Sequence, residues 1–377
     1  MTLAGDIAVR LAWDGRSVCE VRIRSTRPFA SGRVLAGKTG AEAAAMVPLL
    51  YSICGRAQGA AAAAAIDAAE GIEPASATMA ERERTVVLEA IQEYLWRILI
   101  DWPEAMGRSR QSSPVAVARR RIAASAASAA DSRAELAAAL ADVAEIYVYG
   151  EAPGIWLDRI DVDALDRWSR SASTVPATLL RELIDAGPTL GASDVALMPA
   201  PSRAALSASV LPALRKTSSF ERAPEWDGRP AETGALARTQ AHPLIAELRE
   251  RWGNAVPTRM TARLTELALL LRALGADRCD DNRAPWVAAF APNPGEGVAA
   301  VETARGLLLH RACLAAGRIA HYQIVAPTEW NFHPGGPAAR GLMGMPARDE
   351  ATLTTQARLA VQALDPCVAF AVEVAHA

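Results

Sequence analysis

Apolar and polar residues alternate near the start of the chain. The alternation covers residues 7–23, on both sides of a DG dipeptide at residues 14–15, and predicts a β-hairpin. The first strand would present four apolar side chains on one face: Ile7, Val9, Leu11 and Trp13. On the return strand Cys19 shares a face with Val21 and Ile23, so we expect Cys19 to be a small buried core residue rather than a metal ligand.

Helical patterns dominate the rest of the chain. Residues 57–70 are almost pure alanine, the best helix former, and Gly71 stands where this helix should stop. Apolar residues at helical spacing predict another helix over residues 81–100, ending before Pro103. Three more segments predict helices: 115–144, 258–274 and 350–364, the last ended by Asp365-Pro366 because the residue before a proline disfavours helical geometry.

A second alternating segment predicts another hairpin. It covers residues 298–326, on both sides of an AG dipeptide at residues 316–317. Between about 150 and 230 the pattern weakens into prolines, serines and short apolar clusters, so loops and short helices are expected there. No repeat and no long polar linker requires a domain boundary. We therefore predict one mainly α-helical domain with small β elements over residues 1–377, least defined at about 150–220.

Composition and charge narrow the classes of protein. The chain has 377 residues, a formal net charge of -2 and 22% charged residues, as expected for a globular protein with a sizeable core. Its arginines are scattered rather than gathered in a basic stripe, which argues against a nucleic-acid partner. No secretory signal and no apolar stretch long enough to span a bilayer are visible. We expect a cytoplasmic protein with mostly reduced thiols.

Two of the five cysteines stand out by their flanking residues. Cys54 directly precedes the alanine-rich helix, where free N–H groups and the helix dipole should lower the cysteine pKa and favour a metal ligand or nucleophile. Cys367 follows an aspartate and a proline and precedes an apolar tail, VAFAVEVAHA, that we expect to be buried. Taken singly, cysteines of this kind are more often buried structural thiols than metal ligands.

Several segments together resemble one known family. They are ICG at residues 53–55, ETGALAR at 232–238, ETARG at 302–306, GRIAHYQ at 317–323, VAPTEWN at 325–331 and DPC at 365–367. In order and spacing they resemble the large subunit of nickel-iron hydrogenases, whose corresponding motifs include RxCGxCxxxH, EVGPLAR, EAPRG, VVPTTWN and DPCxxCxxH. The resemblance extends from about residue 20 to 373 and implies the fold of that subunit.

The departures from these motifs concern the metal ligands. Five motif positions are changed: Ser52, Ala57 and Ala61 replace arginine, cysteine and histidine, while Phe370 and Glu373 replace cysteine and histidine. The segment at residues 27–30, RPFA, also lacks the proton-relaying glutamate of the family's RGFE. The lost cysteines are those that bridge nickel and iron in the family, and Cys54 and Cys367 match the terminal nickel ligands. Alanine and phenylalanine cannot bind a metal, so hydrogen turnover and bound nickel are not expected.

The retained residues indicate what such a site could still hold. Arg305, Pro327 and Thr328 match the residues that cradle the cyanide and carbonyl ligands of iron in the family. Arginine offers a fork of N–H donors and threonine a hydroxyl, both suited to a cyanide nitrogen. Together with Cys54 and Cys367 as metal ligands, they would suit an iron dicyano-carbonyl unit, Fe(CN)2CO, without nickel.

A shortened, cysteine-depleted chain of this kind is similar to the HupK and HoxV family of hydrogenase maturation proteins. That resemblance implies a non-catalytic scaffold that holds Fe(CN)2CO transiently through Cys54 and Cys367 and passes it to the hydrogenase large-subunit precursor. The HypC-HypD maturation complex is the other implied partner. Two alternatives stay open: a metal-free interaction protein that mimics the large subunit, and a thiol redox enzyme pairing the two cysteines, for which no CxxC motif is present.

Other candidate residues have weaker patterns. Cys279 lies in a polar loop, as an exposed thiol or an auxiliary ligand, and Cys313 should lie in the core of the second hairpin. The five histidines lack the paired spacing of a zinc site, although His376 follows Cys367 closely enough to be a candidate. Because Glu373 replaces the histidine after which the family's tail is removed, we expect no proteolytic maturation of the C-terminus.

Overall fold

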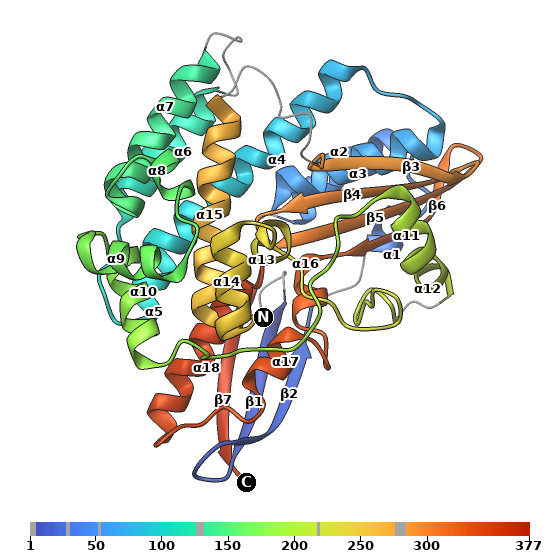
Figure 1. The fold of residues 1–377 in the computed structure, drawn as a ribbon. Helices are drawn as coiled ribbons and strands as arrows, with labels where there is room; N and C mark the ends of the chain where they lie inside the picture. Colours follow the sequence, from blue (N-terminus) through green and yellow to red (C-terminus); the bar gives the residue numbers. More distant parts are fainter. Residues whose placement is uncertain (1–4, 28–30, 52–53, 126–131, 217–218, 276–283) are drawn as a thin grey trace.

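The computed structural model describes residues 5–27, 31–51, 54–125, 132–216, 219–275 and 284–377 (Figure 1). Strands β1 (Asp6–Trp13) and β2 (Val18–Ser25) form the predicted antiparallel hairpin. The four apolar residues expected on one face of β1 are all buried, which confirms that part of the alternation pattern: Ile7, Val9, Leu11 and Trp13. A third strand, β7 (Ala369–His376), joins this sheet in the order β2-β1-β7.

Cys19 is exposed, so its prediction as a core residue is wrong. The register between β1 and β2 shifts at Ala12 and Trp13, where Ala12 pairs with Glu20 but Trp13 pairs with Val18. This β-bulge leaves Cys19 as the extra residue and turns Val18, which is buried, toward the core. The return strand therefore has one extra residue near its start, and the regular alternation of buried and exposed positions holds only after it.

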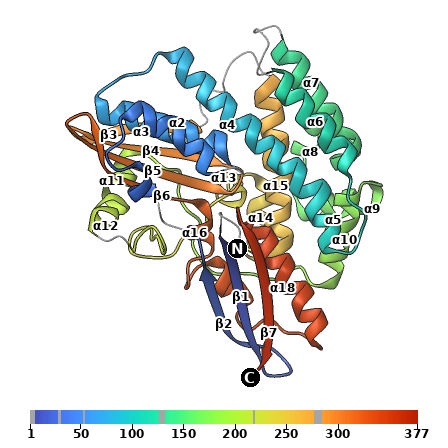
Figure 2. The ribbon, with the colours of Figure 1, turned by 180° about the vertical axis from the view of Figure 1, so that it is seen from behind.

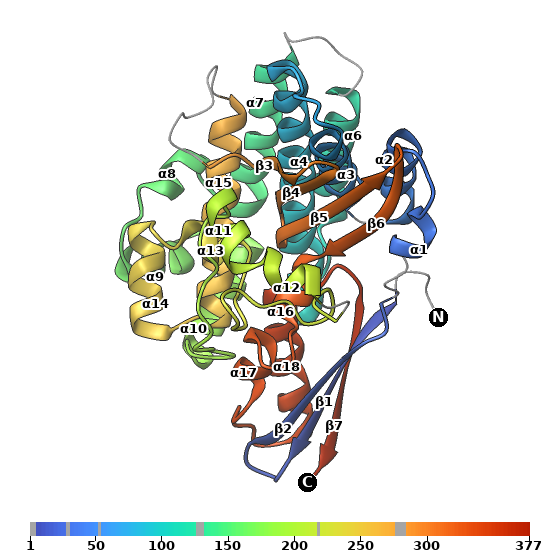
Figure 3. The ribbon, with the colours of Figure 1, turned by 90° about the vertical axis from the view of Figure 1, so that its right-hand side faces the viewer.

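The C-terminal tail is also not buried as predicted. It forms β7, which pairs in parallel with β1 over its full length, from Asp6 opposite Ala369 to Trp13 opposite His376. Side chains of β7 alternate between half-buried and exposed positions, as expected for an edge strand that covers the core with one face. Figure 3 shows this sheet extending away from the rest of the molecule.

A four-stranded antiparallel meander forms the second sheet. Its strands are β3 (Val287–Asn293), β4 (Glu296–Thr303), β5 (Gly306–Ala315) and β6 (Arg318–Val325), in the order β3-β4-β5-β6. The predicted hairpin at residues 316–317 is the β5–β6 turn, but the segment before it is two strands, because residues 304–305 make a further tight turn. The sequence pattern missed that turn and the strand β3.

The alanine-rich helix α3 (Gly55–Glu70) covers one face of this sheet (Figure 2). It confirms the predicted helix, and Gly71 ends it in the left-handed conformation. The contact with β4 is close enough that a Cβ atom at Gly297 would lie 1.9 Å from the carbonyl oxygen of Ala65. The alanines of α3 and the glycine of β4 thus allow the helix backbone to lie directly on the sheet.

Helix α4 (Ser76–Trp96) continues further than predicted. A π-helical turn, η1 (Arg97–Asp101), and α5 (Trp102–Ala105) follow without a break, so the chain stays helical past Pro103. Pro103 lies in the first turn of α5, where a missing N–H is tolerated. The carbonyl oxygen of Leu99, which a regular helix would pair with residue 103, accepts instead from the Gln111 backbone N–H at 2.8 Å.

Several of the remaining helices pack around α15 (Val256–Gly275), which is buried along most of its length (Figure 1). It confirms the predicted helix at 258–274, as α18 (Glu350–Leu364) confirms that at 350–364. The predicted run 115–144 contains two helices that pack together, α6 (Ser112–Ser125) and α7 (Ser132–Ala144). No helix among the described residues is long and apolar enough to cross a membrane.

Short helices account for the segment with the weakest sequence pattern and for several connections. These are α1 (Ser31–Leu35), α2 (Gly40–Leu50), the π-helix η2 (Glu145–Tyr149), α8 (Pro153–Leu157), α9 (Val162–Ser171), α10 (Val175–Ala186), α11 (Arg203–Ser209), α12 (Leu211–Lys216), α13 (Ala235–Thr239), α14 (Pro243–Trp252), α16 (Pro327–Asn331) and α17 (Pro337–Leu342). The loops and short helices expected between about 150 and 230 are therefore confirmed.

Candidate functional site

Cys54 and Cys367 come from opposite ends of the chain and meet in the structure. Cys54 is the residue preceding the first turn of α3, and Cys367 is buried between α18 and β7. Thr328, in the first turn of α16, donates from its hydroxyl to the Cys367 sulfur at 3.1 Å and accepts from the Cys367 backbone N–H at 3.2 Å. The two thiols lie close enough for the charge of Cys367 to raise the pKa of Cys54.

The pKa of Cys54 is raised to about 12, which contradicts the lowering predicted from its place at a helix start. Burial of the thiol is the main cause, followed by the charges of Cys367 and Glu89. Glu89, on α4, accepts from the backbone N–H groups of Arg56 and Ala57, both at 2.9 Å. A carboxylate therefore occupies the helix terminus that was expected to stabilise the Cys54 thiolate.

Arg305 lies in the tight turn between β4 and β5, and its side chain is almost fully buried. Its guanidinium donates to Glu93 at 2.7 Å and lies 3.4 Å from Asp365. Burial alone would lower the pKa of Arg305, but the negative charges of Asp365, Glu93 and both cysteines outweigh burial and raise that pKa. The arginine thus stays cationic beside the two thiols.

Asp365 ends α18 in a left-handed backbone conformation, two residues before Cys367. Three guanidinium groups surround its buried carboxylate: Arg97 at 2.6 Å, Arg305 at 3.4 Å and Arg263 at 3.8 Å. Burial acts to raise the pKa of Asp365, but these cations, Arg305 foremost, bring it below its usual value. The ionised carboxylate fixes the chain at the point where Cys367 enters the site.

Arg27 is a site residue that the sequence analysis did not identify. Its side chain is only 10% exposed and donates at 2.7 Å to Glu329, which follows Thr328 on α16. Burial opposes its positive charge, but Cys367, Glu329 and Cys54 raise the pKa of Arg27. Glu329 replaces the second threonine of the VVPTTWN motif, and this departure is the sequence signal of a buried cation nearby. The residues that follow Arg27 lie outside the described part of the chain.

The ETGALAR segment connects two other parts of the site through hydrogen bonds. The Thr233 hydroxyl accepts from the Leu307 backbone N–H at 2.9 Å, and Asn331 bonds both backbone groups of Thr233, at 3.0 and 3.1 Å. These bonds join the segment to the Arg305 turn and to α16. Arg238 forms ion pairs with Glu266 and Glu302, so these buried charges are paired. Three of the recognised motifs are therefore neighbours in space.

At the positions where the hydrogenase motifs have their other cysteines and histidines, this chain places no metal-binding side chain at the site. Ala57 and Ala61 are buried on α3, and Phe370 packs against the core from β7. Glu373, further along β7, is exposed and pairs with Arg10 at 2.8 Å. No group of three or more His, Cys, Asp or Glu side chains suited to a metal occurs in the described part of the chain. The two cysteines are thus the sulfur donors that the described site offers.

Other predicted candidates lie elsewhere. His376 packs against Trp13 with ring centroids 5.3 Å apart, at the end of β7 remote from Cys367, which at roughly 3.3 Å per strand residue is more than about 20 Å away. Cys313 is half-buried near the end of β5 rather than fully in the core. Cys279 falls outside the described residues.

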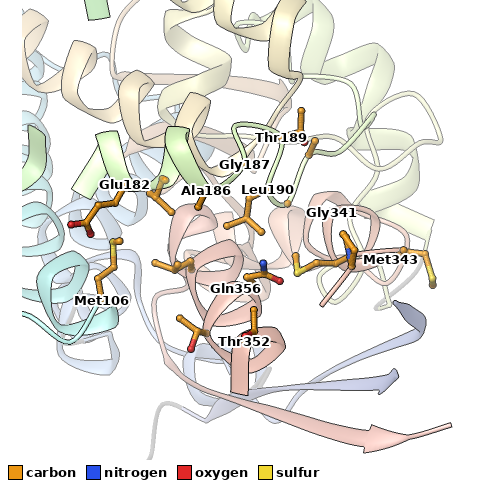
Figure 4. Close-up of a pocket in the computed structure, with 18 of the residues that line it drawn as sticks. Met106, Glu182, Ala186, Gly187, Thr189, Leu190, Gly341, Met343, Thr352 and Gln356 are labelled. Carbon is orange, nitrogen blue, oxygen red and sulfur yellow. The ribbon is translucent and has the colours of Figure 1, made fainter. Parts of the chain in front are cut away.

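The groove shown in Figure 4 is separate from the cysteine site. It has a volume of about 760 Å³ and lies between α10, α17 and α18, with Met106, Met343 and Met345 in its walls. None of the five predicted site residues lines it: Cys54, Arg305, Pro327, Thr328 and Cys367.

Comparison with known proteins agrees with the fold. Residues 253–373 match the family described as nickel-dependent hydrogenase. The chain is 33% identical to the hydrogenase expression/formation protein HoxV of Cupriavidus necator, over 94% of this chain and 93% of that protein. It is 32% identical to HupK of Rhizobium leguminosarum bv. viciae, over 99% and 98%. A chain of the Ni-Fe-Se hydrogenase from D. vulgaris Hildenborough aligns over 94% of both chains, with a TM-score of 0.58 and 17% identity, which shows a common fold.

Proposed function

Because this chain belongs to the HupK and HoxV family of hydrogenase expression/formation proteins, we propose that it is a non-catalytic scaffold that carries an Fe(CN)2CO unit during hydrogenase maturation. Cys54 and Cys367 would each supply one sulfur to the same iron. The observation that carries the proposal is that Arg27 and Arg305 both lie near enough to the two thiols for the charges of Cys54 and Cys367 to raise the pKa values of the arginines.

The donor set suits this cargo better than a free divalent ion. Thiolates are soft ligands that favour iron, whereas the guanidinium groups can donate to cyanide ligands but not bind a metal. The single hydroxyl proton of Thr328 already donates to the Cys367 sulfur. The buried Nε of Arg305 makes no regular hydrogen bond and lies 3.4 Å from the Asp365 carboxylate, as part of their ion pair. A cyanide nitrogen beside the guanidinium would accept a hydrogen bond from this cation.

The raised pKa of Cys54 is consistent with temporary holding. Metal binding requires the thiolate, so the cargo must displace the thiol proton, which burial favours. Competition from that proton weakens retention of the iron. A large-subunit precursor that offers four thiolates would therefore bind the same unit more tightly, and transfer runs toward the precursor. We assign delivery of the unit to a HypC-HypD complex.

Infrared spectroscopy tests the proposal. Protein purified without oxygen, from a host that makes the maturation factors, should show carbonyl and cyanide stretching bands. Cys54→Ser and Cys367→Ser should each abolish them, whereas Cys19→Ser, at an exposed cysteine, should leave them unchanged. Bands that survive in both ligand variants would exclude these cysteines as ligands. A parent protein without bands would favour the metal-free interaction protein.

A further inference from the structure

Three buried polar residues form a hydrogen-bonded chain that ends at Cys54. Gln58 lies one helical turn after Cys54 on α3, His310 lies on β5 and Tyr322 on β6, and all three are at most 2% exposed. The Gln58 side-chain amide contacts the Cys54 sulfur at 3.7 Å. His310 Nε2 lies 2.9 Å from Gln58 Oε1, and His310 Nδ1 lies 2.7 Å from the Tyr322 hydroxyl.

The chemistry of these groups decides which of them donates and which accepts in each hydrogen bond. Burial lowers the pKa of His310 to about 3, so its ring is neutral and has one donor and one acceptor nitrogen. When the Tyr322 hydroxyl donates to Nδ1, the Nε2–H donates to Gln58 Oε1. The Gln58 NH2 group then faces sulfur. The opposite tautomer would turn the amide oxygen toward Cys54, which is repulsive if the sulfur is ionised or bound to a metal.

We propose that Gln58 is a positioning residue whose amide donates a hydrogen bond to the ionised or iron-bound sulfur of Cys54, and that His310 and Tyr322 hold the amide in that orientation. The iron-bound case rests on the proposed function, whereas the ionised case concerns the metal-free protein. Thr328 has the matching role at the other sulfur, because its hydroxyl donates to Cys367. Each thiolate thus has its own donor.

This hydrogen bond changes how the sulfur binds iron. A donor to a thiolate draws electron density away from the metal, so less density passes from iron into the bound carbonyl and the carbonyl stretch rises. It also weakens the iron-sulfur bond, which suits a scaffold that gives up its cargo. Removing the Gln58 amide should therefore lower the carbonyl stretching frequency and slow release of the unit to the precursor.

Gln58→Met removes the amide and keeps the length of the side chain. In protein purified anaerobically with the maturation factors, its carbonyl band should lie at lower frequency than in the parent, and Tyr322→Phe should shift the band in the same direction by less. Gln323→Met is the matched control, since Gln323 bonds Leu214 and Arg311 instead. A carbonyl band at the parent frequency in Gln58→Met would overturn the inference while leaving the scaffold proposal intact.

A second measurement needs no iron. At fixed alkaline pH, iodoacetamide should modify Cys54 of the metal-free Gln58→Met protein about two- to tenfold more slowly than in the parent, because the ionised sulfur loses a hydrogen bond. The exposed Cys19 of the same chain is the internal reference. If the parent shows no infrared bands but this rate falls, the scaffold proposal fails and the positioning role stands. An unchanged rate overturns the positioning role.

Discussion

Arg27 and Arg305 set the charge of the cysteine site from two sides. Both are buried and both interact with the two thiols, but each is also paired with a carboxylate, Glu329 or Glu93. Two thiolates in a buried site repel each other unless cations lie nearby, and burial makes both effects larger than in water. The arginines would therefore offset the negative charge of the proposed iron unit in the protein interior.

The cyanide contact predicted for Arg305 can be separated from iron binding. Arg305→Leu removes the charged donor and leaves both thiols, so iron should remain at lower occupancy, with shifted cyanide bands. The lost hydrogen bond is worth roughly 1.5 to 3 kcal/mol. Arg305→Lys keeps the charge without the fork and should shift the bands less. Equal infrared spectra for Arg305→Leu and the parent would show that Arg305 does not contact the cyanide ligands.

The Arg27–Glu329 pair gives a stability prediction. Arg27→Met leaves a buried carboxylate without its cation and should lower the free energy of unfolding by about 3 to 5 kcal/mol in urea titrations. Combining it with Glu329→Gln removes the stranded charge, so the double variant should recover much of that loss. A double variant as unstable as the sum of both single variants would show that the two residues do not act as a pair.

His310 gives the fold an acid-sensitive component. Its pKa is about 3 in the folded protein and near 6.5 when unfolded, so its stabilising contribution is complete above pH 6.5 and is lost as the pH falls toward 3. The unfolding free energy of the parent, minus that of His310→Gln, should decrease by about 1.4 kcal/mol per pH unit between pH 6 and 4. A difference independent of pH would mean that His310 is protonated when folded.

At the residue scale, the sequence motifs identified the two cysteines together with Arg305 and Thr328, but not Arg27 and Glu89 beside them. The lowered pKa expected for Cys54 follows from a local rule for helix starts. It failed mainly because the thiol is buried, and also because Cys367 and the carboxylate of Glu89, which caps the same helix from α4, act on it. Arg27 was missed because its partner Glu329 lies 302 residues away in sequence. Burial and charge at a site depend on such distant neighbours, which a pattern along the chain does not reveal.

At the scale of elements, the turn between β4 and β5 positions Arg305 through a glycine. Gly306 has φ 124°, and a Cβ atom there would lie 2.5 Å from Thr233. Gly306→Ala should therefore destabilise the protein clearly more than Gly317→Ala, whose φ is 71° and whose Cβ meets nothing within 4 Å. The strain of placing alanine in a left-handed backbone conformation alone costs about 1–2 kcal/mol of stability. If thermal unfolding shows equal losses of stability for the two variants, the contact with Thr233 does not add to the cost of the substitution at Gly306.

Long helices with strong patterns were predictable, and long-range strand pairing was not. The helices at 57–70, 258–274 and 350–364 formed as expected because their residue choice and ends agree locally. The pairing of β7 with β1 joins the two ends of the chain, and neither strand alone encodes its partner. The turn between β4 and β5 was missed because alternation continues on both sides of it.

At the scale of the whole molecule, the fold is that of hydrogenase large subunits while the bridging ligands are absent. The parent protein should show no hydrogen uptake with an artificial electron acceptor, and metal analysis should find little nickel even when nickel is supplied. The methyl group of Ala57 and the ring of Phe370 stand where the resemblance places bridging sulfurs. Stoichiometric nickel together with turnover would contradict a non-catalytic role.

X-ray absorption at the iron edge tests the central claim most directly, because it counts the atoms bound to iron. Protein purified anaerobically with the maturation factors should show short iron-carbon scattering from diatomic ligands and two iron-sulfur contacts, one from Cys54 and one from Cys367. Iron bound only by oxygen and nitrogen, without sulfur or diatomic ligands, would contradict the account.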